Sequence, residues 1–245
     1  MILKFNTSVL SYNGRILNFV TPSTGTTGNL VTTATLSNAS IVSQSPFTGA
    51  SSGNSYSVTA STTSYLSVSG QTGFAMGTGD YTIEWFQYET DSNSFPRIYW
   101  YGSSPSLGMS LEGSYYSWVG ASGTALGTKG AITNAWQHFA LVRISSKLYF
   151  YKNGTLVSSA GGVSDASNIT DTTSNFIIGA KIGGLTSEQF GGYITNFRVV
   201  KGLGVYTGNF TRPTSVLTAV AAANPYGGSN TVEIPNGYTK LLLTP

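Results

Sequence analysis

Apolar and polar residues follow a short period along most of the chain, and Gly, Ser, Thr and Asn interrupt the pattern every few residues. Such short runs are typical of β-strands, in which successive side chains point to opposite faces of a sheet. Apolar residues rarely recur at the spacing of three and four that an amphipathic helix requires. The pattern therefore predicts an all-β protein.

The clearest strands lie between residues 136 and 157. Residues 136–143 (WQHFALVR) are apolar on both faces, as expected of a central strand that is covered on both sides. Ser145-Ser146 can turn the chain into residues 147–151, and Asn153-Gly154 can turn it again. Three strands joined by two tight turns predict an antiparallel meander.

The two ends of the chain read differently from its centre. Residues 2–9 and 16–21 are strand candidates on either side of Asn13-Gly14, a strong hairpin signal, and residues 22–29 form a Thr/Gly-rich linker. A looser stretch near the C-terminus precedes a last candidate strand at residues 238–243. We therefore divide the chain into a β-hairpin arm with its linker, a β-sandwich, and a tail with a returning strand; the ranges are 1–29, 30–218 and 219–245.

Several motifs in series resemble the concanavalin A-like lectin/glucanase superfamily, in particular its laminin G-like, pentraxin-related branch. They are residues 81–86 (YTIEWF), 136–143, 151–154 (YKNG) and 192–202 (GYITNFRVVKG), with Tyr206 and residues 210–213 (FTRP) behind them. The resemblance covers about residues 30–217 and implies a two-sheet antiparallel jelly roll. Domains of this kind occur in phage and giant-virus structural proteins and in bacterial surface proteins. Fold by itself does not settle function.

Composition narrows the classes of function. Of the 245 residues, 40% are hydrophobic and only 9% are charged, so Ser, Thr, Asn, Gly and Tyr must cover the surface. The net charge of +3 is spread along the chain without a run of Lys or Arg, which does not support nucleic-acid binding. Cysteine is missing, which excludes disulfides and thiolate metal sites. Neither a signal peptide nor an apolar run of about 20 residues is evident, so we expect synthesis in a host cytoplasm without membrane insertion.

Glycosidases act through paired carboxylates, for which Glu84 and Glu89 are the first candidates. They lie an odd number of positions apart, so a regular strand directs them to opposite faces, with Cα atoms roughly 17 Å apart. Catalytic carboxyl pairs lie about 5–9.5 Å apart. The pair therefore does not fit, and we expect Glu84 to face solvent or to pair with an arginine.

A second catalytic pattern, G-x-S-x-G at residues 49–53, also lacks its context. A nucleophile elbow requires a helix after the serine, whereas residues 54–58 read as a strand. His138 is the only histidine and lies inside a central strand. We expect it to have a structural, hydrogen-bonded role.

Aromatic and acidic residues supply the remaining candidates for a site. Tyr99-Trp100-Tyr101 and the segment 115–118 place rings on both faces of a strand, so one set can stack on sugars or on a neighbouring subunit. The predicted ligand-binding residues are Tyr99, Tyr101, Tyr115 and Trp118. Relatives in the pentraxin-like and laminin G-like branches often bind calcium, and Asp165 and Asp171 in one predicted loop are the candidate ligands for a weak Ca²⁺ site.

The preferred interpretation is a non-catalytic virion structural protein, either a capsid decoration protein or part of a fibre. Its partners would be other virion subunits or copies of itself, with surface glycans as a further possibility, and its location the virion surface. The alternative is a carbohydrate-binding lectin module used in adhesion, for instance on a bacterial surface. The third is a laminarinase-like glycoside hydrolase, against which the missing carboxylate pair counts.

Overall fold

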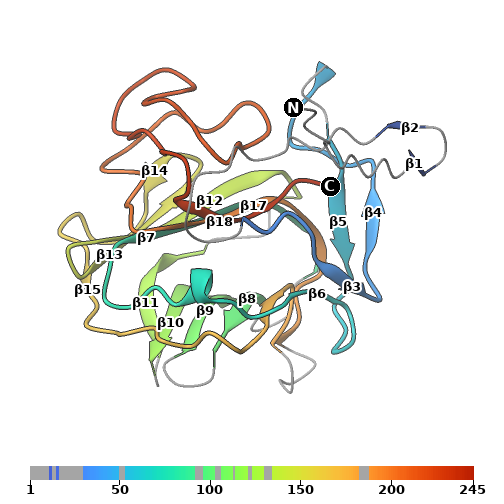
Figure 1. Cartoon of the computed structure of the whole chain (residues 1–245), viewed down its shortest axis with the longest axis horizontal. Coiled ribbons are helices and arrows are strands. Elements are labelled where there is room, and N and C mark those ends of the chain that lie inside the picture. Colours follow the sequence, from blue (N-terminus) through green and yellow to red (C-terminus); the bar gives the residue numbers. More distant parts are fainter. Residues whose placement is uncertain are drawn as a thin grey trace, which may run out of the picture.

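The computed structural model describes residues 11–12, 15–16, 30–49, 53–91, 96–102, 106–112, 114–120, 123–129, 134–181 and 188–245. Residues from 30 onward form two antiparallel β-sheets packed face to face, with a short 3-10 helix at Thr72–Phe74, and residues 11–12 and 15–16 pair as a separate two-stranded sheet (Figure 1). The predicted all-β jelly-roll sandwich is confirmed. Across the described ranges, no helix is long and apolar enough to cross a membrane.

The larger sheet has nine strands within the described part of the chain, and we call it the nine-stranded sheet. Its spatial order is β14 (Thr155–Leu156), β13 (Lys147–Lys152), β12 (Gln137–Ile144), β7 (Tyr81–Glu89), β17 (Gly192–Lys201), β5 (Ser55–Val58) and β4 (Ser40–Val42). Two further strands join this path, β15 (Val163–Ser164) beside β13 and β18 (Thr239–Leu243) beside β17. Strand β7 therefore lies at the centre, between β12 and β17.

The smaller sheet has seven strands among the described residues and is called the seven-stranded sheet. Its order is β11 (Gly123–Thr128), β10 (Ser114–Gly120), β9 (Ser106–Glu112), β8 (Arg97–Tyr101), β16 (Phe176–Ile178), β6 (Tyr65–Val68) and β3 (Thr35–Ser37). Asn38, at a positive φ of 40°, lies between β3 and β4, where the chain passes from one sheet to the other.

Both turns predicted in the meander are present. Ser145 and Ser146 have φ values of 49° and 61°, and Asn153 and Gly154 have values of 51° and 82°. Positive φ at both central residues defines the type I′ turn, whose twist matches that of the flanking strands. The carboxylate of Asp80 accepts a hydrogen bond from the Ser145 amide at 2.9 Å, which supports the unusual serine turn.

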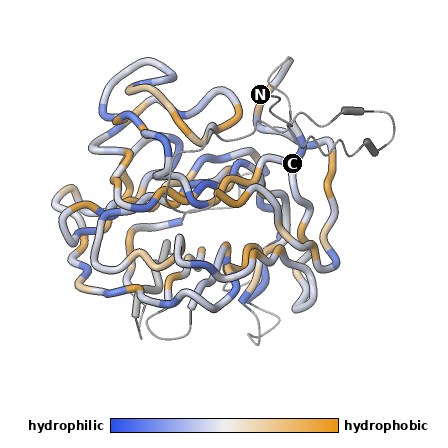
Figure 2. The backbone as a smooth tube through the Cα atoms, viewed as in Figure 1, coloured by the Kyte–Doolittle hydropathy of each residue, from blue (hydrophilic) through white to orange (hydrophobic). Residues whose placement is uncertain are grey.

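The space between the sheets is filled by aromatic and aliphatic side chains, and apolar stretches run along both layers (Figure 2). Trp85 of β7 lies at the centre of this core and is fully buried. Its ring stacks on Phe139 at 5.6 Å and on Phe197 at 6.1 Å, and it meets Tyr99 of the opposite sheet edge-on at 5.6 Å. Burial of this many large rings supplies the main driving force for closing the sandwich.

A second hydrophobic core lies on the outer face of the nine-stranded sheet. It joins residues of β12, β13 and β17 to side chains of the segment 203–236, which we call the C-terminal segment. In Figure 1 this orange-to-red segment loops over the sheet before the chain returns as β18. The part of the nine-stranded sheet around Ala140 and Val142 is therefore covered on both faces, which explains why the run at residues 136–143 is apolar on both sides.

Little of the predicted N-terminal arm falls within the described residues. Strands β1 (Ser11–Tyr12) and β2 (Arg15–Ile16) pair with Tyr12 opposite Arg15, as expected of a hairpin around Asn13-Gly14. The strand predictions over residues 2–9 and 17–21 lie outside the described part. Val31 then lies beside β18, where its amide donates to Lys240 O at 3.0 Å and its carbonyl accepts from Leu242 N at 2.9 Å.

Candidate functional site

Alternate residues of β7 point away from the main core. Tyr81, Ile83 and Trp85 belong to the core between the sheets. The even-numbered residues therefore face outward, because side chains alternate along a strand. In order along β7 these outward-facing residues are Thr82, Glu84, Phe86 and Tyr88.

The C-terminal segment covers the first of these residues, Thr82. The Thr82 side chain hydrogen-bonds with backbone groups of that segment. Thr82 Oγ1 donates to the carbonyl of Leu203 at 3.0 Å and accepts from the amide of Val205 at 2.9 Å. Thr82 and Val205 are both buried. A threonine hydroxyl that serves as donor and acceptor in this way fixes where the segment crosses β7.

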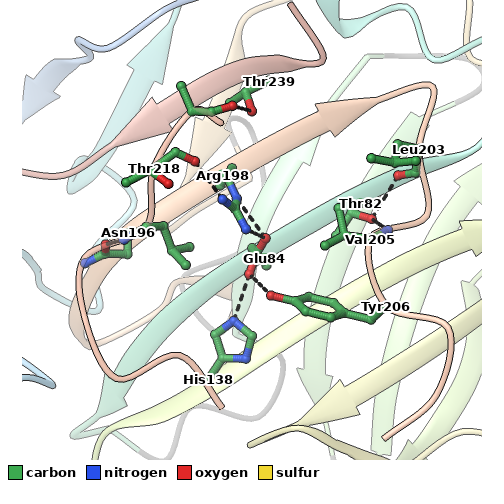
Figure 3. Close-up of polar contacts among 12 residues, drawn as sticks. Thr82, Glu84, His138, Asn196, Arg198, Leu203, Val205, Tyr206, Thr218 and Thr239 are labelled. Atoms are coloured by element: carbon green, nitrogen blue, oxygen red, sulfur yellow. Dashed lines mark hydrogen bonds and ion pairs between the residues drawn. The ribbon is translucent and has the colours of Figure 1, made fainter. Parts of the chain in front are cut away.

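Glu84 lies at the centre of the covered face and holds three side chains (Figure 3). Its Oε1 accepts hydrogen bonds from Arg198 Nε at 2.8 Å and Nη2 at 2.6 Å. Its Oε2 accepts from the Tyr206 hydroxyl at 2.7 Å and lies 3.0 Å from His138 Nε2. We call Glu84, His138, Arg198 and Tyr206 the buried polar cluster, since none of them exceeds 3% exposure.

The protonation states of this cluster follow from its burial and its contacts. Burial opposes ionisation of Glu84, but the charge of Arg198 and the hydrogen bonds from His138 and Tyr206 outweigh it and lower the Glu84 pKa to about 2. Burial lowers the pKa of His138 more than the hydrogen bond and charge of Glu84 raise it. The cluster is therefore a carboxylate–guanidinium pair with a neutral imidazole, which makes it electrically neutral.

This arrangement is suited to holding the fold together. A general acid needs a pKa raised toward neutral pH and access to its substrate, as in glycosidases. Glu84 has a lowered pKa and is fully buried. Arg198 Nη1 also donates to the carbonyl of Thr218 in the C-terminal segment at 2.6 Å. The cluster thus fastens this segment to the sheet.

The next outward position, Phe86, is covered from two sides. The ring of Phe47 meets it edge-on at 5.1 Å, and the guanidinium carbon of Arg212 lies 5.2 Å from its centroid. Phe86 is fully buried. Phe86 is the last outward-facing residue of β7 that other segments of the chain cover.

At Tyr88 the outer face becomes accessible, and three aromatic rings gather there. Strand pairing places Tyr193 of β17 opposite Tyr88, and Gln137 opposite Gln87, so Trp136 falls beside Tyr88 on the other side. Ring centroids lie 5.9 Å apart for Tyr88 and Trp136, 5.8 Å for Tyr88 and Tyr193, and 6.3 Å for Trp136 and Tyr193. We call these three residues the aromatic triad; all three are partly exposed.

Of the four predicted ligand-binding residues, Tyr99 and Tyr101 are fully buried in the core between the sheets. Their rings pack on Phe176 at 5.6 and 5.5 Å. The expectation that they offer stacking faces is corrected, because β8 turns them inward and leaves Trp100 partly exposed. Tyr115 and Trp118 lie in β10, paired with Leu111 and Gly108, and their side chains are outside the described part.

The two predicted calcium ligands accept hydrogen bonds from side chains and backbone amides around them. Asp165 Oδ2 accepts from Arg143 Nε at 2.7 Å, and Asp165 Oδ1 accepts from the Ser167 amide at 3.0 Å. Asp171 accepts from both the amide and the hydroxyl of Ser174, which together with Thr173 lower its pKa to about 2. Within the described ranges, no three His, Cys, Asp or Glu side chains gather as a metal site. A weak calcium site at Asp165 and Asp171 stays a prediction.

The catalytic candidates are separated as their spacing predicts. Glu84 faces the C-terminal segment, whereas Glu89 pairs with Lys129 at 2.5 Å. His138 is bonded to Glu84 and buried, in agreement with a structural role. Residues 50–52 of the G-x-S-x-G pattern lie outside the described residues.

Sequence reasoning missed the aromatic triad as a site. Tyr88 continues the even-numbered series along β7, and Trp136 and Tyr193 stand at the beginning of two recognisable strand motifs. Each position is a local signal for an exposed or half-exposed ring. Their assembly depends on the register of three strands, which the sequence alone does not supply.

The chain is similar to several solved structures. The binding domain of Paraclostridial mosquitocidal protein 1 is similar at a TM-score of 0.53 and 14% identity, over 71% of this chain and 45% of that one. Domain 4 of an extracellular arabinanase from Geobacillus stearothermophilus has a TM-score of 0.48 and 15% identity, over 67% of this chain and 82% of its own. A tailspike domain of bacteriophage CBA120 has a TM-score of 0.49 and 12% identity, over 80% of this chain and 34% of its own.

The chain thus spans less than half the length of the first of these structures, and identities this low report on fold alone. No curated protein matches the sequence. The family described as the concanavalin A-like lectin/glucanases superfamily matches residues 51–203, which is more than half of the chain. Together with the two-sheet sandwich and its central strands β7, β12 and β17, this match shows that the chain belongs to the concanavalin A-like lectin/glucanases superfamily.

Proposed function

We propose that this protein is a non-catalytic, lectin-like subunit of a virion, a capsid decoration or fibre component that serves assembly or attachment to a surface. The observation that carries the non-catalytic part is the burial of Glu84. The carboxylate at the centre of the outer face is bound by Arg198, His138 and Tyr206 and covered by the C-terminal segment. A substrate has no path to it without displacing that segment.

The other carboxylate of β7 does not complete a catalytic pair. Glu89 is largely buried, and burial raises its pKa although Lys129 opposes this effect. A raised pKa would suit a general acid, but Glu84 lies on the opposite face of the same strand. A second carboxylate at about 5–9.5 Å is what a glycosidase of either stereochemistry requires.

Hydrolysis is tested directly with soluble β-glucans such as laminarin. We expect no release of reducing sugar above the rate of a Glu89→Gln variant. Turnover by the wild-type protein that disappears in Glu84→Gln or Glu89→Gln would instead establish a glycoside hydrolase and overturn the proposal.

The role in a virion is supported by the N-terminal residues and by the composition. The family match begins at residue 51, so the arm lies before it. A two-stranded hairpin such as β1–β2 is only marginally stable alone, so the apolar residues around it need another surface. A sister subunit or a capsid shell would supply that surface. The low share of charged residues, 9%, suits a surface that packs against neighbours.

Immunogold labelling of source particles with an antibody to this chain tests the virion role, and we expect regular labelling of the particle surface. Deleting residues 1–28 tests the arm. We expect the truncated protein to keep a similar melting temperature, since Val31 still pairs with β18, but to lose oligomerisation or particle binding. A truncated protein that is insoluble or melts far lower would place the arm in the core instead.

A second candidate, a carbohydrate-binding adhesion module outside any virion, is favoured by the aromatic triad. Partly exposed rings on a rigid sheet are a common way to bind the apolar face of a sugar. This candidate would be selected over the first if the protein binds to a glycan array and the antibody to this chain does not label the source particles.

A further inference from the structure

We propose that the aromatic triad is the ligand-binding surface of this protein and that its ligand is an uncharged saccharide whose ring packs on Trp136 and Tyr193. This inference rests on the lectin-like function proposed above and names the site and the class of ligand. The site differs from the one expected from the sequence, which lay on two strand segments around residues 99–101 and 115–118. Tyr88, Trp136 and Tyr193 come from three other strand regions.

The first argument is where the cover of the sheet ends. Thr82, Glu84 and Phe86 are each buried beneath the C-terminal segment or the segment that carries Phe47. Tyr88, the next outward residue of the same strand, is partly exposed, as are both of its aromatic neighbours. These three residues each have a hydrophobic or hydrogen-bonded partner from the same chain, whereas the residues of the triad stay partly exposed.

The second argument is rigidity. The rings meet one another at interplanar angles of 70° for Tyr88 and Trp136, 60° for Tyr88 and Tyr193, and 39° for Trp136 and Tyr193. The two contacts of Tyr88 are edge-to-face, an arrangement that stabilises ring positions. The three residues also belong to the paired central strands β7 and β17 or directly precede β12. A surface that is ordered before binding loses little conformational entropy when a ligand arrives.

The third argument is the polar groups beside the rings. Ser57 of β5 lies opposite Tyr193 in the strand register and is partly exposed. Thr90, two residues beyond Tyr88, is exposed, and partly exposed Asp91 follows it. Hydroxyl groups both donate and accept hydrogen bonds and a carboxylate accepts them, which matches the hydroxyl groups around a sugar ring.

A glycine brings Asp91 close to this edge of the sheet. A Cβ atom added to Gly191 would lie 2.7 Å from the Cβ of Asp91, a distance that real side chains avoid. The amide of Thr90 donates to the carbonyl of Gly191 at 3.0 Å, so the two segments are held together there. Glycine at this position therefore permits Asp91 to pack beside the strand that carries Tyr193.

The charges beside the triad favour an uncharged ligand. Glu89, the residue after Tyr88, points to the opposite face of β7, where it pairs with Lys129 and so adds no net charge near the triad. Asp91 adds a negative charge on the rim, which would repel a sialic acid or a sulfated sugar. We therefore expect recognition of neutral hexose or pentose rings over acidic ones.

The experiment is a glycan array that carries matched neutral and acidic oligosaccharides, followed by isothermal titration calorimetry of the full-length chain with the best neutral hit. We expect binding to neutral glycans and affinity at least about tenfold weaker in Trp136→Ala and in Tyr193→Ala, the loss of a single good aromatic contact. Tyr238→Ala, which removes a tyrosine exposed to 38%, is the matched control and is expected to bind as the wild type does. Near-UV circular dichroism and the melting temperature verify that each variant is folded.

Each other outcome overturns a defined part of the proposal. Neutral-glycan binding that survives in both variants places the site elsewhere, although the lectin-like function stands. Preference for acidic glycans refutes the class of ligand. If the wild type binds no glycan but Trp136→Ala and Tyr193→Ala abolish its incorporation into particles, the triad is a protein contact; the glycan proposal fails and the virion role stands.

Discussion

The hydroxyl of Tyr206 donates a hydrogen bond of 2.7 Å to Oε2 of Glu84 and so joins the C-terminal segment to the centre of β7. Both residues are buried, and burial together with the nearby charge of Glu84 raises the pKa of Tyr206 well above its usual value. The hydroxyl is therefore protonated at neutral pH and can donate this hydrogen bond. This contact closes the face on which a catalytic cleft could otherwise open.

Tyr206→Phe removes only this donor, while the ring can still stack on Phe210. We expect it to lower the free energy of unfolding by about 1–3 kcal/mol, because a buried carboxylate loses one of its partners. For a chain of this size that corresponds to several degrees in melting temperature, at roughly 2–4 °C per kcal/mol. Differential scanning calorimetry measures the shift. Tyr238→Phe, at an exposed position, is the control and should not move the transition.

The Glu84–Arg198 pair predicts a specific double-mutant result. Glu84→Leu and Arg198→Met should each destabilise the protein by about 3–5 kcal/mol, since each leaves an uncompensated buried charge. The double variant should be less destabilised than either single variant, because no isolated charge remains. Urea denaturation of the four proteins gives the coupling free energy. Additive single effects would show that the pair contributes nothing as a pair.

His138 predicts how stability depends on pH. Its pKa is lowered in the folded protein, so below about pH 6.5 the unfolded chain takes up a proton that the folded protein refuses. The free energy of unfolding should therefore fall between pH 7 and pH 5, by at most about 2 kcal/mol. Glu84 affects the free energy of unfolding in a more acidic range. Its stabilising effect is present above about pH 4.3 and is lost as the pH falls toward 2.

Urea denaturation at pH 7, 6 and 5 for the wild type and for His138→Gln measures this dependence. The difference between the two proteins should shrink or reverse toward pH 5, because the variant has no imidazole to protonate. Glu89, whose pKa is raised, contributes in the opposite direction in both proteins and cancels in the comparison. Parallel pH profiles for the two proteins would contradict a buried neutral His138.

The turn between β13 and β14 should be intolerant of a side chain. Gly154 has a φ of 82°, and a Cβ there would lie 2.1 Å from the carbonyl oxygen of Phe210 in the C-terminal segment. Gly154→Ala should therefore cost at least about 2 kcal/mol in thermal or urea unfolding, through backbone strain and displacement of that segment. Gly161→Ala is the matched control, since nothing lies within 4 Å of its added Cβ. Equal stability of the two variants would argue against this close approach.

Several features of this protein depend on local chemistry and can be predicted from short stretches of sequence. Asn153-Gly154 and Ser145-Ser146 specify tight turns, and the apolar run at residues 136–143 requires cover on both faces. The motifs around Trp85, His138 and Arg198 were enough to indicate the superfamily. The odd spacing of Glu84 and Glu89 separated them onto opposite faces, because the period of a strand is a local property.

Which aromatic residues are buried and which are exposed depends on how the two sheets pack together. Alternation along β8 allows either Trp100 or the pair Tyr99 and Tyr101 to face inward, and packing against Phe176 selects the pair. The aromatic triad and the buried polar cluster each join side chains far apart in the chain through strand register and through the path of the C-terminal segment. A register is fixed by the sum of many weak contacts across the whole sandwich, so no short stretch of sequence reveals it.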